Sequence, residues 1–352
     1  TAIFARTMGL PTIVAVGKNF TSKYEGLFAI VDGNSGKIYI DPDESTITRF
    51  KEIKKTDDSQ KSHLEEFRGK ITVTRSGRKI NLYANSGSLA DIDLIKASDA
   101  EGIGLFRSEY IFMQAHDYPT EDYQLDIYKN VLEQMEGKKV IIRTLDIGAD
   151  KTAEYFMLKP EDNPAMGVRA IRLCLQNKAI FKTQLRALYR ASVYGNLSIM
   201  VPLITSVEEV LETKKIIQEV KTELKQQNLA FNDNVEFGIM IETPAAALIS
   251  DELAKVVDFF SIGTNDLTQF TLAADRQNAD LTKYLNPYHH AVVRLIEMTI
   301  QNAHACGIWV GICGELASDE KFLGKLIQLQ VDEMSVVPSS VLTLRAKIAS
   351  LG

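Results

Sequence analysis

The sequence has few cysteines and no long apolar run, and both absences limit what the protein can be. Its 352 residues include three cysteines, Cys174, Cys306 and Cys313. Because they follow neither a disulfide nor a zinc-binding spacing, they suit a protein of the reducing cytoplasm. No apolar run reaches the ~20 residues that span a membrane, and no signal peptide is present, so we expect no membrane partner.

The sequence also lacks an excess of positive charge. Its formal net charge at pH 7 is -6, which argues against an extended surface for nucleic acid and so against a nucleic-acid partner. The hydrophobic fraction of 45% and the charged fraction of 24% are typical of a globular protein. The length is sufficient for one large domain or two ordinary ones.

The start of the chain predicts a small α/β unit. Residues 1–8 have the pattern of a short helix, and residues 12–16 have that of a strand. Residues 27–31 and 37–40 form a predicted hairpin around a glycine-rich turn. Because these elements bury little on their own, we expect residues 1–43 to be part of a domain.

A charged segment follows, and then the pattern of the chain changes. Residues 44–70 place Ile47, Phe50 and Ile53 at helical spacing among many charges, which predicts a linker helix. From residue 71 to residue 352, short β-rich runs alternate with longer helical patterns. Eight such units predict a (β/α)8 barrel of the TIM type, with an open doubly wound sheet as the architectural alternative. The predicted strands are 80–84, 102–106, 140–144, 197–202, 236–241, 259–263, 309–313 and 334–337.

Polar side chains follow the predicted strand 259–263. Asn265 and Asp266 come directly after its terminal glycine, and Arg276 lies ten residues further on. On its own, this pattern also fits a helix N-cap with a solvated arginine. The other predicted strands repeat the feature, however, and the carboxyl ends of barrel strands meet at one cavity. The polar groups at these ends are Arg107, Arg143, Asp146, Lys151, Glu242, Asn265, Asp266, Arg276, Cys313 and Glu315.

The charges of this set predict its ligands. Arg107, Arg143 and Arg276 would repel one another unless a multiply charged anion lay between them. Glu242 and Asp266 would repel each other unless they shared a divalent cation. Together the two groups predict a phosphorylated anion bound with Mg²⁺.

Cys313 has two interpretations. A cysteine in an apolar strand is often a small buried hydrophobic residue. Its place at a strand end, between Gly311 and Gly314, favours a functional thiol. At an ordinary pKa of about 8.5 that thiol stays mostly protonated at neutral pH, so it would serve as a proton donor rather than as a nucleophile.

With these residues identified, the whole chain closely resembles the enzyme I family, the phosphoenolpyruvate–protein phosphotransferases of the bacterial sugar phosphotransferase system. The combination of motifs that carries the resemblance is highly specific. These motifs are 1–11, Gly102-Ile-Gly-Leu-Phe-Arg-Ser-Glu109, Ile142-Arg-Thr-Leu-Asp-Ile-Gly-Ala-Asp-Lys151, Arg169-Ala-Ile-Arg-Leu173, Gly238-Ile-Met-Ile-Glu242, Phe260-Ser-Ile-Gly-Thr-Asn-Asp266, Ala273-Ala-Asp-Arg276 and Gly311-Ile-Cys-Gly-Glu315.

The resemblance implies a role for each site residue. Asn265 would orient phosphoenolpyruvate, and Cys313 would protonate the methylene carbon of the enolate that remains after transfer. Glu242 and Asp266 would hold Mg²⁺. The groups that would bind the phosphoryl group, or lie near it, are Arg107, Arg143, Arg276, Lys151 and Arg169.

The resemblance also implies the reaction and its partners. The phosphoryl group would pass from phosphoenolpyruvate to a histidine and then to a small histidine-containing carrier protein, with release of pyruvate as the first step of sugar uptake. That histidine is absent from this chain and is expected just before Thr1. Residues 1–43 would then be the remnant of a swivelling phosphohistidine domain, 44–70 its linker, and 71–352 the phosphoenolpyruvate-binding barrel of a homodimer.

The chain departs from the family pattern at Ala149, Val168 and His290, and its C-terminal tail after Gly352 looks shorter than the family's. None of these positions carries a proposed catalytic group. Two alternatives stay open at this point: a fragment of phosphoenolpyruvate synthase or pyruvate phosphate dikinase, and a phosphoenolpyruvate sensor without turnover.

Overall fold

The structure is a computed structural model that describes residues 12–13, 16, 21–33, 35–148 and 153–352. It contains two compact units, Thr1–Arg68 and Gly69–Gly352, and we describe each by itself. The predicted helix at 1–8 lies outside the described residues, as do residues 14–15 of the predicted strand at 12–16, and the described residues 12, 13 and 16 are not in a strand. None of the helices in the described part of the chain is both long and apolar enough to cross a membrane.

The first unit contains a hairpin and one long helix. Strands β1 (Ala29–Asp32) and β2 (Lys37–Ile40) pair antiparallel, with Ala29 opposite Ile40. Helix α2 (Glu44–Glu65) begins where the Asp43 side chain accepts a hydrogen bond from the Thr46 amide. The sequence predicted a helix as far as residue 70. It ends at Glu65 because the next three amides bond to carbonyls three residues back, a tight turn that Gly69 follows with a φ of +73°.

In the described part of the second unit, eight parallel strands close into a barrel in the order β10-β3-β4-β5-β6-β7-β8-β9. The predicted (β/α)8 barrel is therefore confirmed, and each predicted strand agrees with an observed strand to within two residues. Closure is made by β10 and β3, where Glu333 pairs with Asn81. The strands are β3 (Asn81–Ser86), β4 (Gly102–Arg107), β5 (Lys139–Arg143), β6 (Leu197–Val201), β7 (Glu236–Ile241), β8 (Phe259–Gly263), β9 (Trp309–Cys313) and β10 (Glu333–Val336).

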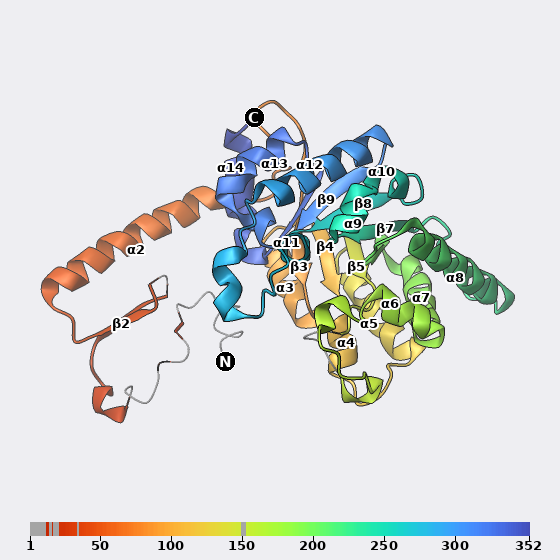
Figure 1. Cartoon of the computed structure of the whole chain (residues 1–352). Helices are drawn as coiled ribbons and strands as arrows, with labels where there is room; N and C mark the ends of the chain where they lie inside the picture. Colours follow the sequence, from red (N-terminus) through yellow and green to blue (C-terminus); the bar gives the residue numbers. More distant parts are fainter. Residues whose placement is uncertain (1–11, 14–15, 17–20, 34, 149–152) are drawn as a thin grey trace. The chain divides into compact units, whose positions relative to one another are not determined.

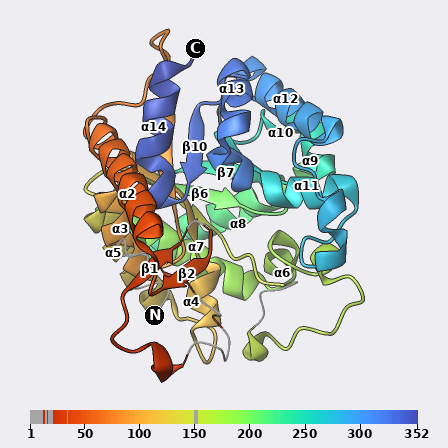
Figure 2. The same cartoon turned by 90° about the vertical axis from the view of Figure 1, so that its left-hand side faces the viewer.

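Helices surround the strands of this unit (Figures 1 and 2). They are α3 (Ile92–Ala97), α4 (Glu109–Met113), α5 (Glu121–Gln134), α6 (Ile171–Gln176), α7 (Lys178–Ala191), α8 (Val207–Gln226), α9 (Pro244–Leu248), α10 (Ser250–Leu253), α11 (Thr264–Leu272), α12 (His290–Ala305), α13 (Glu320–Gln328) and α14 (Val341–Ser350). Short 3₁₀ turns are η1 (Ser22–Tyr24) in the first unit and, in the second, η2 (Leu89–Asp91), η3 (Glu154–Phe156), η4 (Pro164–Met166), η5 (Ser192–Tyr194), η6 (Ala279–Tyr284), η7 (Glu315–Ser318) and η8 (Pro338–Ser340).

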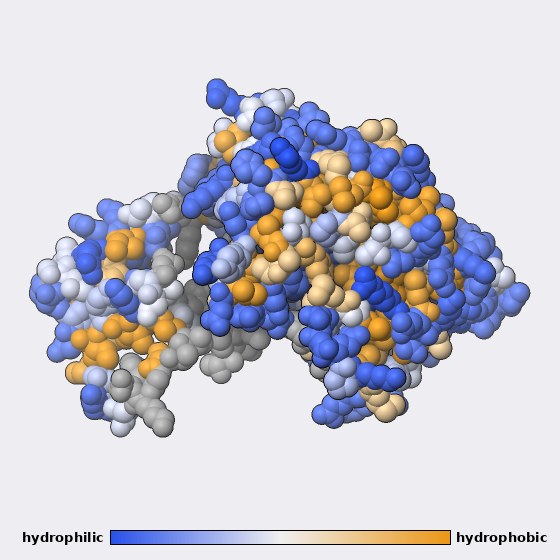
Figure 3. Space-filling model, viewed as in Figure 1, coloured by the Kyte–Doolittle hydropathy of each residue, from blue (hydrophilic) through white to orange (hydrophobic). Residues whose placement is uncertain are grey.

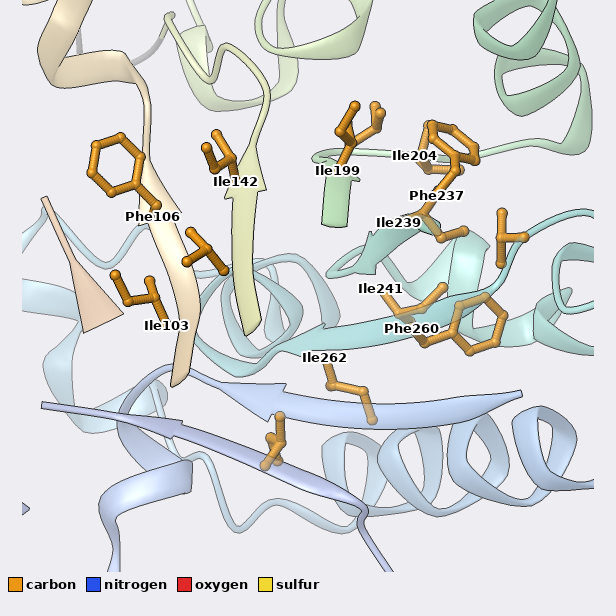
Figure 4. Packing of buried hydrophobic residues seen from close by; sticks show 14 of the residues in the cluster. Ile103, Phe106, Ile142, Ile199, Ile204, Phe237, Ile239, Ile241, Phe260 and Ile262 are labelled. Atoms are coloured by element: carbon orange, nitrogen blue, oxygen red, sulfur yellow. The ribbon is translucent and has the colours of Figure 1, made fainter. Parts of the chain in front are cut away.

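The barrel strands have buried side chains on both faces, which explains their nearly continuous apolar sequences. A large cluster fills the space between strands and helices, and Figure 4 shows part of it, including Ile142, Ile199 and Ile239. A smaller cluster fills the barrel interior and includes Phe259, whose ring stacks on that of Trp309 at 4.4 Å. The outer cluster holds the helices on the strands, and this framework fixes the positions of the strand ends.

A buried arginine ties the last helix to the start of the barrel. Arg345 on α14 is 1% exposed. Its Nε donates to Oγ1 of Thr72 at 3.0 Å, and its Nη2 donates to the Asp99 carbonyl at 2.6 Å. Its guanidinium also forms an ion pair with the Asp99 carboxylate. Residues at the two ends of the unit are thus joined beside the β10–β3 closure.

Candidate active site

A cavity of about 350 Å³ lies at the carboxyl ends of the barrel strands. Its walls come from β4, β5, β7, β8 and β9 and from the segments that follow some of them, as expected for a parallel barrel. The residues that line it are Leu105, Arg107, Glu109, Tyr110, Met113, Arg143, Asp146, Met240, Glu242, Gly263, Asn265, Asp266, Arg276, Cys313 and Gly314.

Two glycines let the polar strand ends approach one another. A Cβ on Gly263 would lie 2.9 Å from Oε2 of Glu242, so a larger residue would displace that carboxylate. Gly314 has a φ of +92°, and a Cβ there would lie 2.3 Å from Oγ1 of Thr264 and 2.9 Å from Oδ1 of Asn265. The backbone after β9 can therefore pack directly against the start of α11.

Arg143 and Arg169 are buried and already paired with carboxylates. Nη2 of Arg143 lies 2.7 Å from Oε1 of Glu109 and 2.8 Å from Oδ2 of Asp146. Nη2 of Arg169 lies 2.8 Å from the other oxygen of Asp146 and 3.6 Å from Oδ2 of Asp266. Asp146 therefore bridges the two guanidinium groups and fixes their relative positions.

The electrostatics of the network keep both arginines charged. Burial alone would lower the pKa of Arg143, but the nearby carboxylates of Asp146, Glu109 and Glu242 outweigh it and raise the pKa. Burial likewise opposes the charge of Arg169, while Asp146 and Asp266 raise its pKa. The Nε atoms of both residues are buried and donate no hydrogen bond to any described residue. Each arginine therefore keeps donor capacity that its carboxylate partners do not use.

Arg107 and Arg276 are held less tightly. Arg107 is half-buried at the end of β4, and it forms no ion pair within the described ranges. Nη2 of Arg276 lies 3.5 Å from Oδ1 of Asp266, and the Arg276 side chain is 35% exposed. Among the described arginines that line the cavity, these two side chains are therefore the most available.

Glu242 and Asp266 are two buried carboxylates with different partners. Oε1 of Glu242 accepts a hydrogen bond from the Leu203 amide at 2.7 Å. Burial is the main reason why the pKa of Glu242 is raised, and the negative charges of Asp266 and Asp146 add to it. Oδ1 of Asp266 is buried and accepts no hydrogen bond from the described residues.

These two carboxylates fit a magnesium ion. Mg²⁺ prefers oxygen ligands, and proteins usually supply one or two carboxylates while water and substrate phosphate complete the octahedron. No group of three or more acidic, histidine or cysteine side chains with metal-binding geometry occurs in the described part of the chain. Two carboxylates would leave the other positions of the octahedron to water and to oxygens of a ligand.

Cys313 lies at the end of β9 and is 3% exposed. Ser261 Oγ donates to its Sγ at 3.6 Å. Burial is the main reason why the pKa of Cys313 rises to about 12. The thiol is therefore protonated at neutral pH and adjoins the cavity, as a proton donor requires.

The side-chain amide of Asn265 is held by a hydrogen bond to its oxygen. Its Oδ1 accepts a hydrogen bond from the Glu315 amide at 3.0 Å, and the neighbouring Thr264 hydroxyl donates to the Cys313 carbonyl at 2.9 Å. Because the amide oxygen is occupied, the Asn265 NH₂ group is left to donate toward a ligand.

Most of the residues singled out from the sequence come together in this cavity. Arg169 lies behind it, and it lines a neighbouring cavity of about 150 Å³ that shares Asp266 and Arg276 with the first. Lys151 falls outside the described residues. The members that line the main cavity are Arg107, Arg143, Asp146, Glu242, Asn265, Asp266, Arg276 and Cys313.

Sequence reasoning missed the carboxylates that neutralise the arginines. Asp146 was noted only as a neighbour of Arg143, and Glu109 was given no role. The expectation that Arg107, Arg143 and Arg276 repel one another without a ligand needs correction for Arg143, since Glu109 and Asp146 already pair with it. The available signal was the short spacing Arg107-Ser-Glu109, which places a carboxylate at the first turn after a strand.

The sequence is similar to one family and to several curated proteins. Residues 61–352 match the model of the family described as PEP-utilising enzyme, PEP-binding domain. The chain is 45% identical over 350 residues to the phosphoenolpyruvate-protein phosphotransferase of Bacillus subtilis and 44% identical to that of Priestia megaterium. Each alignment covers 99% of this chain and 61% of the relative. The chain thus spans about three fifths of the length of the curated relatives it matches.

Proposed function

The chain belongs to the family of PEP-utilising enzymes that share a PEP-binding domain, and on this premise we propose that its cavity binds phosphoenolpyruvate with Mg²⁺. In this proposal it serves as the substrate-binding part of a phosphoenolpyruvate–protein phosphotransferase. The observation that carries the proposal is the convergence of Arg107, Arg143 and Arg276 with Glu242 and Asp266 on one cavity.

Arginines bind the phosphoryl group in this proposal. Arg143 is held in place before substrate arrives by Glu109 and Asp146, while Arg107 and Arg276 can adjust to the ligand. Phosphoryl transfer passes through a loose transition state that spreads negative charge over the equatorial oxygens. Preset guanidinium groups stabilise that charge without reorganisation.

The remaining polar groups hold the metal and orient the substrate. Glu242 and Asp266 hold Mg²⁺, which when bound neutralises charge on the phosphoryl oxygens. The Asn265 amide donates to the substrate from a side chain that the Glu315 amide has already oriented.

Cys313 completes the reaction. Loss of the phosphoryl group leaves the enolate of pyruvate, whose methylene carbon is a base. The Cys313 S–H bond breaks and its proton forms the new C–H bond, which gives pyruvate and a thiolate. The high pKa of this buried thiol keeps the proton in place until the enolate forms.

The wider function rests on the similarity to the longer relatives. We propose that the phosphoryl group passes to a histidine upstream of Thr1 and then to a small histidine-containing carrier protein. Residues 1–43 would be the remnant of the domain that carries this histidine, with 44–70 as its linker. A homodimer through the barrel is supported by exposed apolar side chains such as Leu248 and Tyr284, 62% and 56% exposed. Figure 3 shows hydrophobic residues, coloured orange, gathered on the visible surface of the second unit.

Calorimetry on this chain tests the binding step. We expect phosphoenolpyruvate to bind at least about tenfold more tightly with Mg²⁺ than without it, since a divalent cation offsets the charge between ligand and carboxylates. Asp266→Asn should remove this gain. Glu236→Gln is the matched control, because Glu236 lies at the opposite end of the strand that precedes Glu242. If phosphoenolpyruvate binds neither with Mg²⁺ nor without it, the proposal is refuted.

Transfer is tested separately, in a protein of the relatives' length that contains this chain. Phosphoenolpyruvate alone should phosphorylate the carrier protein and release pyruvate. A requirement for ATP would instead favour a dikinase, and tight binding without any transfer would favour a sensor.

A further inference from the structure

The cations of the cavity differ in whether they already have a carboxylate partner. Arg143 contacts Glu109 at 2.7 Å and Asp146 at 2.8 Å. Glu109 and Asp146 are each 1% exposed, so these ion pairs lie out of water. Arg107, in contrast, pairs with no carboxylate in the part of the chain that the structure describes.

This difference determines what an incoming anion meets. Arg107 can receive an anion without losing a contact. To reach the Nη2 of Arg143, the anion competes with Glu109, and in a cavity of low dielectric it also lies close to that carboxylate. Glu109 therefore opposes the binding of an anion that arrives without a cation.

We propose that Glu109 is a specificity-determining residue that makes the cavity discriminate against phosphate groups that arrive without Mg²⁺. Cellular phosphate and phosphate esters carry the same phosphoryl group as the proposed substrate. This proposal rests on the proposed function, in which the substrate binds together with Mg²⁺. The negative charge of Glu109 raises the energy of the anion-bound cavity until a divalent cation on Glu242 and Asp266 compensates for it.

Glu109 could instead only hold Arg143 in position, and the two roles predict opposite results. If Glu109 selects by charge, its neutralisation strengthens metal-free phosphate binding. If it acts only as a clamp, neutralisation frees Arg143 to move and weakens the binding of every anion. The sign of the change therefore separates the two roles.

The experiment is calorimetric titration of inorganic phosphate into this chain, without Mg²⁺ and then with it. The variant Glu109→Gln keeps the size and an oxygen acceptor but removes the charge. We expect its metal-free affinity for phosphate to exceed that of the wild type about tenfold, the value of one charged hydrogen bond. We also expect the gain from Mg²⁺ to shrink by a similar factor.

Glu121→Gln is the matched control. Glu121 forms two ion pairs with arginines, to Arg186 and Arg190 at 2.6 Å each, but it lies on α5 at the outside of the barrel. This variant should bind phosphate like the wild type. Equal or weaker metal-free binding by Glu109→Gln overturns the proposal.

Two further measurements keep the test decisive. If Glu109→Gln does not fold, wild-type affinity decides: phosphate binding that is equally tight with and without Mg²⁺ overturns the proposal. Titration with phosphoenolpyruvate separates the two proposals. If it fails to bind while the phosphate results hold, only the proposed function fails. If it binds while the phosphate results do not hold, only the role of Glu109 fails.

Discussion

Ser261 donates a hydrogen bond from its Oγ to the Sγ of Cys313 across 3.6 Å, between adjacent strands of the barrel. The contact orients a thiol that burial keeps protonated, since its pKa is raised to about 12. Sulfur in this state is a poor nucleophile and metal ligand, because both roles need the thiolate. The arrangement supports proton donation as the role of Cys313.

The first prediction concerns that role. Cys313→Ala should leave the affinity for phosphoenolpyruvate and Mg²⁺ nearly unchanged, because the thiol acts on the enolate and contributes little to ground-state binding. Pyruvate formation in a protein of the relatives' length should slow at least about a hundredfold, the usual contribution of a general acid. Calorimetry and a coupled pyruvate assay measure the two quantities. Lost binding with normal residual turnover would mean that Cys313 only packs.

The second prediction concerns the arginines. Arg107→Lys, Arg143→Lys and Arg276→Lys should each slow phosphoryl transfer at least about tenfold, or 1.4 kcal/mol, because an ammonium cannot reproduce a planar fork of donors. Arg143→Lys should also lower the melting temperature, since it weakens the buried contacts to Glu109 and Asp146. Arg294→Lys, an exposed position on α12, serves as the control. Wild-type rates for two of the three variants would contradict the site.

The barrel could be predicted from the sequence because parallel strands buried on both faces are short apolar runs with polar residues at their ends. The same pattern located the site, since strand ends converge in a barrel. The ion pairs were not predictable in this way. Glu109 and Arg143 are 34 residues apart, and their contact depends on side-chain conformations and on the neighbouring positions of β4 and β5.

Glu333 is a second feature of the structure that could not be predicted from the sequence. The sequence predicted a strand at 334–337, which leaves Glu333 outside it. In the structure β10 begins at Glu333, and its carboxyl group lies within the barrel. Gly104 and Gly311 leave the space, since a Cβ on either would come within 2.4 Å of a Glu333 oxygen. The space for the Glu333 side chain exists only once the strands that carry Gly104 and Gly311 have closed into a barrel, so the local sequence does not show it.

The third prediction concerns the buried pairing of Arg345. Arg345→Met should reduce the free energy of unfolding by about 3–5 kcal/mol, the cost of breaking a buried ion pair from one side. The loss arises because the Asp99 carboxylate and the Thr72 hydroxyl would lose the guanidinium group that pairs with them in the wild type. Urea unfolding measures it. Lys129→Ala, which removes an exposed pair with Glu133, should change the stability by about 0.5 kcal/mol or less. Equal effects for both variants would show that Arg345 does not hold the barrel closed.

The fourth prediction concerns Glu333 and pH. Burial raises the pKa of Glu333 well above its ordinary value, and the nearby Lys139 opposes this only in part. Neither carboxyl oxygen has a hydrogen-bond partner among the described residues. The folded protein therefore holds a proton on Glu333 at pH values where the unfolded chain has lost it. The contribution of protonated Glu333 to stability is fully present below the pKa of Glu333 in the unfolded chain, about 4.5. It is lost as the pH rises through the higher pKa of Glu333 in the folded protein.

Glu333→Gln should remove this dependence, because the amide is neutral at every pH and nearly the same size. Relative to wild type, the variant should gain stability as pH rises from 5 to 8, by up to about 1.4 kcal/mol per pH unit. Urea unfolding at several pH values gives the difference. Glu297→Gln, which alters the partly exposed pair of Glu297 on α12 with Lys325 on α13, should show a difference that is constant with pH. A constant difference for Glu333→Gln as well would mean that the Glu333 carboxyl group is ionised inside the barrel, and its protonation in the folded state would have to be abandoned.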